Sequence, residues 1–84
     1  MAALSLTKAE TEQLRALRAR IGRNVHRWRV RRKLRLERCA ALTGLAAESL
    51  DLFELGGGEI SFHAIVRLAQ ILDVRPEHLL AEEN

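Results

Sequence analysis

The side chains that most often carry out chemistry in proteins are few in this chain and widely spaced. Its 84 residues include three histidines, His26, His63 and His78, and one cysteine, Cys39. Their spacing matches no metal-ligand pattern, and no histidine is marked out as the base of a cysteine or carboxylate nucleophile. The three glycines at 56–58 lack the Lys-Ser/Thr that completes a phosphate-binding loop. We therefore predict that the chain is not an enzyme, binds no metal and needs no cofactor.

The remaining composition favours an intracellular setting. A single cysteine cannot form an intramolecular disulfide, which fits the reducing cytosol. The longest apolar stretches are only a few residues, and the N-terminal residues do not have the layout of a signal peptide. We expect a cytoplasmic protein with no membrane partner.

Charge is distributed unevenly along the sequence. Residues 1–38 contain 12 Lys/Arg against three Glu, whereas residues 39–84 contain two Arg against eight Asp/Glu. The net charge of +3 conceals this asymmetry. A protein with such a dipolar surface can direct its basic side at an anion, either a nucleic acid or an acidic protein.

A long first helix is predicted by its cap and its apolar period. Thr7 and Glu10 have the Thr-x-x-Glu spacing of a capping box. An apolar stripe then recurs at steps of three and four residues: Leu14, Leu17, Ile21, Val25 and Trp28. A separate face of the same helix carries four arginines, Arg20, Arg23, Arg27 and Arg31. That face is either solvated or a binding surface.

Four shorter helices are predicted after it. They cover residues 34–42, residues 46–55, a segment with Ser61 as its N-cap, and a last segment with Pro76 in its first turn. Gly44 supplies the tight turn between the second and third helices. No segment alternates like a strand, so the class is all-α. We expect one domain over residues 20–84, with residues 1–19 as an N-terminal extension of its first helix.

The order of these features resembles the Cro/CI-type, or Xre-like, helix-turn-helix family. The resemblance runs without a gap over residues 21–80. It rests on Ile21, Gly22, Val25, Trp28 and Arg29 in the first helix, Leu34, Ala40, Gly44 and Leu45 around the turn, and Leu50, Phe53, Glu54, Gly56, Ser61, Arg67, Leu68, Ala69, Leu72, Val74, Leu79 and Leu80 beyond it. The resemblance implies a five-helix fold, an ion pair between Arg29 and Glu54, and a buried, inert thiol at Cys39. It also implies that the first residues of the second and third helices face DNA.

At those positions the sequence departs from the family pattern. Arg35 replaces the usual Ser/Thr cap, Leu36 the usual Gln, and Ala46 a second cap. Donors suited to base readout are missing from the expected face of the third helix. We predict instead an apolar patch with an acidic rim, formed by Leu36, Ala47, Leu52 and Ile60 with Glu48 and Asp51. The alternative is that these leucines are scattered or pack within the monomer.

Two functions follow from these observations. The first is a regulator that keeps the fold but binds a protein through this patch, such as a transcription activator, as small antiactivators of the family do. The second is a dimeric DNA-binding repressor that uses its arginines: Arg20, Arg23, Arg27, Arg29, Arg31 and Arg35. Leu14 and Leu17 must also be buried, either against the C-terminal helix or in a homodimer.

Overall fold

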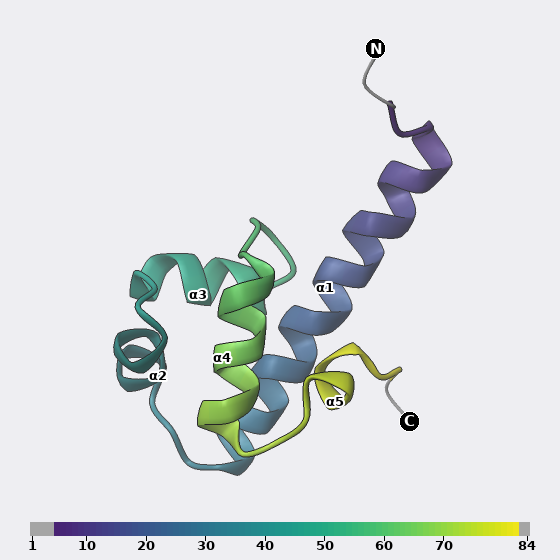
Figure 1. Cartoon of the computed structure of the whole chain (residues 1–84). Coiled ribbons are helices and arrows are strands. Elements are labelled where there is room, and N and C mark those ends of the chain that lie inside the picture. The colour runs from purple at the N-terminus through teal and green to yellow at the C-terminus, as the bar shows by residue number, and fades with distance from the viewer. Residues whose placement is uncertain (1–4, 83–84) are drawn as a thin grey trace.

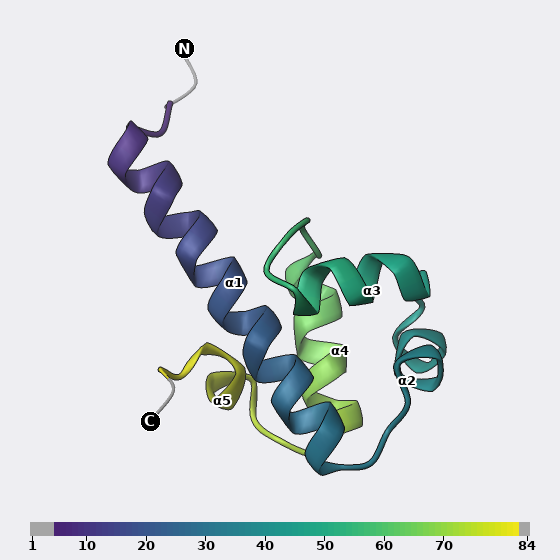
Figure 2. The same ribbon diagram turned by 180° about the vertical axis from the view of Figure 1, so that it is seen from behind.

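Helix α1 (Lys8–Arg31) begins at the predicted capping box. The Thr7 hydroxyl accepts a hydrogen bond from the Glu10 backbone N–H at 3.1 Å, and the Glu10 carboxylate accepts one from the Thr7 N–H at 2.9 Å. Hydrogen bonding to the Thr7 backbone N–H, and to a lesser extent to the Thr7 side chain, holds the pKa of the Glu10 carboxyl below its usual range. In the computed structural model, which describes residues 5–82, the N-terminal half of α1 projects beyond the other helices (Figures 1 and 2).

Helices α2 (Leu36–Thr43) and α3 (Ala47–Glu54) form the predicted helix-turn-helix. Gly44 ends α2 with a φ of +78°, a left-handed conformation that glycine adopts without a steric penalty. The Leu45 N–H donates to the Ala40 carbonyl at 2.9 Å and closes the turn. Arg35 is extended and is the N-cap of α2, as the resemblance implied, so the helix begins two residues after the start of the predicted segment 34–42.

Helices α4 (Phe62–Leu72) and α5 (Pro76–Leu80) also begin where the sequence predicts. The Ser61 hydroxyl accepts from the Ala64 N–H at 3.1 Å, and Pro76 is the first residue of α5. Helix α3 crosses α1 directly, and α4 packs mainly against α2 and α5 (Figures 1 and 2). The described residues contain five helices and no strand, which confirms the all-α prediction.

The core lies where these helices meet. Its fully buried side chains come from every helix: Val25, Cys39, Leu50, Phe53, Leu68, Leu72 and Leu79. Helix α1 crosses α3 so closely at Gly22 that a Cβ there would lie 1.9 Å from the Phe53 carbonyl oxygen. Glycine therefore sets the distance between these two helices. Within residues 5–82, no helix is both long and apolar enough to cross a bilayer.

The packing of α1 corrects one expectation. The sequence offers the C-terminal helix as the intramolecular neighbour of Leu14 and Leu17, but α5 contacts α1 further along, at Asn24 and Trp28. Leu17 packs against the core, and both leucines line a hollow at the start of α4.

Candidate interaction surface

The outward side of α3 carries a stripe of acidic and apolar residues. Glu48, Asp51, Leu52 and Leu55 follow the i, i+3, i+4, i+7 spacing of one helix face. The buried residues of α3, Leu50, Phe53 and Glu54, lie on the opposite side. Leu52 is 52% exposed and Leu55 77% exposed. We call these four outward residues the α3 stripe.

The segment of the sequence that contains the α3 stripe has no basic residue. Residues 46–61 contain four acids, Glu48, Asp51, Glu54 and Glu59, and no Lys or Arg. The N-caps Arg35 and Ala46 make no side-chain hydrogen bond to the starts of α2 and α3. Of these four acids, Glu48 and Asp51 are exposed on α3, whereas Glu54 is buried against Arg29 and Glu59 pairs with Arg18.

The structure divides the predicted apolar patch. Leu36, Ala47 and Ile60 are half-buried and pack against the core, so Leu52 is the most exposed apolar member of the four. Leu52 lies against the loop after α3, where a Cβ on Gly57 would be 3.0 Å from its Cδ1 atom. Glu48 and Asp51, the predicted rim residues, are exposed on the same helix.

Leu55 is the member of this surface that sequence reasoning missed. It follows Glu48 by seven residues, so it lies two turns further along the same face. The seven-residue spacing from Glu48 was the sequence signal that could have identified Leu55 as part of this surface.

Behind the α3 stripe, Arg29 and Glu54 form the ion pair that the resemblance implied. Arg29 Nε lies 2.7 Å from Glu54 Oε2, and Arg29 Nη2 lies 2.8 Å from Oε1. Their side chains are only 13% and 3% exposed. The hydrogen bond to Glu54 raises the pKa of Arg29, and Arg29 Nη1 also donates to the Leu34 carbonyl at 3.0 Å. The pair ties α1 to the end of α3 and to the segment before α2.

His26 joins this pair, although its sequence context gave no sign of a carboxylate partner. Its Nδ1 lies 2.7 Å from Glu54 Oε1, while the side chain remains largely exposed. His26 precedes Arg29 by three residues, so both face α3 from the same side of α1. Glu54 is thus surrounded by two basic side chains from α1.

The structure does not gather the six arginines of the DNA-binding alternative. Arg29 is engaged by Glu54, and Arg35 stands at the start of α2. Arg20, Arg27 and Arg31 lie on the side of α1 opposite Gly22 and the contact with α3, by the 3.6-residue period. Arg23 is exposed at the edge of that face. The α1 arginines and the α3 stripe therefore point in different directions.

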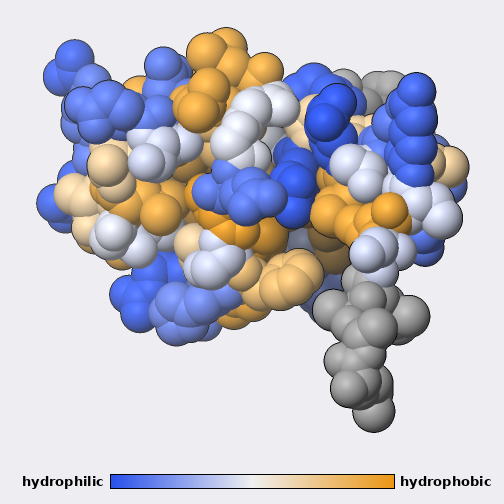
Figure 3. Space-filling view, turned by 90° about the horizontal axis from the view of Figure 1, so that it is seen from above, coloured by the Kyte–Doolittle hydropathy of each residue, from blue (hydrophilic) through white to orange (hydrophobic). Residues whose placement is uncertain are grey.

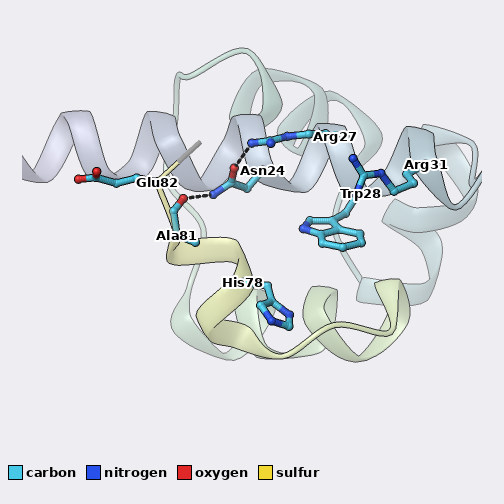
Figure 4. A pocket seen from close by; sticks show the side chains of 7 residues that line it. All are labelled: Asn24, Arg27, Trp28, Arg31, His78, Ala81 and Glu82. Carbon is cyan, nitrogen blue, oxygen red and sulfur yellow. Dashed lines mark hydrogen bonds between the residues drawn. The ribbon is translucent and has the colours of Figure 1, made fainter. Parts of the chain in front are cut away.

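A shallow hollow lies beside these arginines, between α1 and α5 (Figure 4). Arg31 lies over the Trp28 ring, 5.0 Å from its centroid, and Arg20 pairs with Glu82 at 3.3 Å. Trp28 is half-buried and packs against the core, which fits its expected role as a core residue.

Asn24 links α1 to α5 and the residue after it through hydrogen bonds. Its amide donates to the Leu79 carbonyl at 2.8 Å. The amide also donates to the Ala81 carbonyl at 2.8 Å, and its oxygen accepts from Arg27 at 2.6 Å (Figure 4). Sequence reasoning overlooked Asn24. Its place in the sequence was the available signal, because Asn24 is a polar residue between Ile21 and Val25 on the apolar side of α1. A buried polar side chain requires a hydrogen-bond partner.

Cys39 lies in the core, and burial raises the pKa of its thiol. A thiol in that setting is a poor nucleophile, because the thiolate is the reactive form. Among the described residues, no group of three or more His, Cys, Asp or Glu side chains could hold a metal ion.

The fold and its turn define a helix-turn-helix protein, and comparison with solved structures agrees. The chain is similar to the crystal structure of the restriction-modification controller protein C.AhdI from Aeromonas hydrophila. The two share 30% identity with a TM-score of 0.70, and the match covers 76% of this chain and 97% of C.AhdI. The chain belongs to the Cro/CI-type (Xre-like) helix-turn-helix family of regulators. No family model matches it, and no curated protein does.

Proposed function

We propose that this regulator acts by binding another protein through the α3 stripe, in the manner of an antiactivator. The partner is a transcription regulator, such as an activator, with an apolar groove bordered by basic side chains. One observation carries the proposal: α3, the helix that reads DNA in this family, exposes two acids, Glu48 and Asp51, and has no Lys or Arg.

Electrostatics argue against DNA as the ligand of this surface. Protein–DNA affinity comes largely from Lys and Arg that neutralise phosphates and release counterions. Glu48 and Asp51 are exposed and would bring negative charge toward phosphates. Each such contact is repulsive and releases no counterion, whereas a basic protein surface would be attracted.

The apolar members of the α3 stripe suit a protein groove. Helices that bind in grooves present apolar anchors on one face, for example at i and i+3, the spacing of Leu52 and Leu55. Leu52 and Leu55 supply two exposed apolar anchors on it. Interfaces commonly combine an apolar centre with a polar rim, and Glu48 and Asp51 provide that rim.

Replacing an anchor tests the proposal. We expect Leu52→Asp to abolish co-purification of the chain with a transcription regulator identified by mass spectrometry, and to abolish its effect on that regulator's target promoter. The matched control is Leu6→Asp, because Leu6 is 56% exposed and precedes α1, whose N-terminal end projects away from α3 (Figure 1). Circular dichroism should show both variants folded. The proposal is wrong if Leu52→Asp still captures the regulator and acts on its promoter as the control does.

Leu36 is a poorer site for such a variant than the sequence suggests. It is half-buried against the core, so a lysine there would disturb folding as well as binding.

A second candidate function is a dimeric DNA-binding repressor of the Cro/CI type. The likeness to C.AhdI, a restriction-modification controller protein, favours it. So does the excess of bases in residues 1–38. In this case Arg35 and the α1 arginines would contact phosphates, and the regulated genes would be those of a restriction-modification system.

A further inference from the structure

The hollow between α1 and α5 has both charged and aromatic walls (Figure 4). Helix α1 supplies Arg27, Trp28 and Arg31, and His78 and Ala81 lie on the side of α5. The cavity volume is about 200 Å³, below the roughly 300 Å³ at which drug-sized sites begin. A ligand of this hollow, which we call the α1–α5 hollow, is therefore about the size of one ring with one substituent.

The apolar hollow at the start of α4 has a different character. Its walls include Leu14, Leu17 and Phe62. Figure 3 looks onto this end of the molecule, where orange apolar patches lie between blue hydrophilic side chains. Among the described residues that line it, Arg18 is the one base, and it pairs with Glu59 at 2.8 Å. The α1–α5 hollow is therefore the better site for an anion.

Both arginines of the α1–α5 hollow are positioned by neighbouring side chains. Arg27 Nη2 donates to Asn24 Oδ1 at 2.6 Å, and Asn24 is itself only 3% exposed and hydrogen-bonded to α5. Arg31 lies over the Trp28 ring, 5.0 Å from its centroid. Stacking uses the face of a guanidinium and leaves the N–H groups in its plane for a ligand. Positioned side chains also lose less entropy on binding than mobile ones.

Trp28 and His78 give the hollow an aromatic wall. Their ring centroids lie 6.3 Å apart, and the ring planes are tilted by 32°. Trp28 packs against the core, which fixes its ring. His78 Nδ1 accepts a hydrogen bond from the Arg75 N–H at 3.3 Å, which orients the imidazole. A third ring can contact this wall in the edge-to-face or offset arrangements that aromatic groups prefer.

The charged groups of the hollow favour an anion with acceptor oxygens. A guanidinium has N–H donors and no acceptor. Glu82 is the acid at the edge of the hollow, and it pairs with Arg20 at 3.3 Å. The planar fork of an arginine matches the two oxygens of a carboxylate. An inorganic anion would use these donors but would leave the aromatic wall without a contact.

We propose that the α1–α5 hollow binds a small aromatic carboxylate. The carboxylate lies on Arg27 and Arg31, and the ring lies against Trp28 and His78. Small-molecule sites combine apolar walls with a few well-placed polar groups, and this hollow provides both. The hollow is on the side of α1 away from α3, so the proposal does not depend on the protein partner of the α3 stripe.

Titration of the isotope-labelled chain with benzoate, followed by two-dimensional NMR, tests the site. We expect saturable shifts of the amides of residues 24–31 and 78–82, with a Kd of about 1 mM or tighter. Acetate has the carboxylate without the ring, and benzamide has the ring without the charge. Both should bind at least tenfold more weakly, and so should inorganic phosphate at matched ionic strength. No shift with benzoate, shifts centred elsewhere, or phosphate binding as tightly as benzoate would each overturn the proposal.

A pair of arginine variants separates a formed site from general attraction of an anion to a basic protein. Arg31→Gln should weaken benzoate binding at least tenfold, because it removes one of the two guanidinium forks. The matched control is Arg38→Gln, at an exposed arginine of α2 that does not line the hollow, and it should leave the affinity unchanged. Both positions are exposed, so circular dichroism should show both variants folded. Equal losses from the two variants, or no loss from Arg31→Gln, would contradict the proposed site.

Discussion

Glu54 shows how a single residue can hold this fold together. It ends α3, is almost completely buried, and accepts hydrogen bonds from Arg29 of α1 while contacting His26. A buried charge is tolerated only when it is paired and hydrogen-bonded. We therefore expect that removing Glu54 lowers the stability of the fold, because it leaves the charge of Arg29 without its partner.

Glu54→Ala should lower the free energy of unfolding by about 3–5 kcal/mol, the range for breaking one side of a buried ion pair. Urea denaturation followed by circular dichroism measures the change. The matched control is Glu48→Ala, an exposed carboxylate on the same helix, which should stay within about 0.5 kcal/mol of wild type. Equal effects from the two variants would contradict the role given to the pair.

Among individual residues, the contact that the family pattern implies could be predicted from the sequence. Contacts and burial that depend on how the helices pack could not. The Arg29–Glu54 pair followed from the resemblance. Leu36 looked as available as Leu52, because a sequence does not reveal which side of a short helix meets the core. His26 and Asn24 were overlooked because their partners lie 28 and 55 residues away.

At the element scale, the decisive contact is the crossing of α1 and α3. Their backbones approach so closely at Gly22 that a methyl group would meet the Phe53 carbonyl oxygen. A backbone atom cannot rotate away as a side chain can, so the helices themselves would have to separate.

Gly22→Ala should therefore destabilise the fold by about 1–3 kcal/mol, the usual cost of overpacking, despite alanine's higher helix propensity. Thermal melting gives the direction, and urea denaturation gives the magnitude. Gln13→Ala, at an exposed position of α1, should change stability by no more than about 0.5 kcal/mol. A Gly22→Ala variant as stable as wild type would show that the crossing is looser than described.

Helix positions followed well from caps, turn residues and apolar periods, since these are local signals. Thr7, Ser61 and Pro76 each mark a helix start that the structure confirms. At the start of α2 the family resemblance located the N-cap Arg35, whereas the helical segment predicted over residues 34–42 began two residues early, because Arg35 makes no side-chain cap. The neighbours of Leu14 and Leu17 were missed because they depend on the angle at which α4 meets α1.

At the scale of the whole molecule, charge separates into two surfaces. The α1 arginines lie toward α5, and the acids of the α3 stripe lie on the far side of α1. The asymmetry read from the sequence is therefore present in space, but it does not bring the bases to the helix that reads DNA in this family. A single duplex would have difficulty engaging both surfaces.

A DNA-binding titration across salt concentration tests the central claim most directly. The probes are fragments that include the gene's own promoter, with an unrelated fragment of equal length as the control. We expect equal, weak affinity for both, because phosphate attraction through the α1 arginines carries no sequence information. Nanomolar binding that is selective for the promoter, with a steep salt dependence, would contradict the proposal that the α3 stripe serves a protein partner.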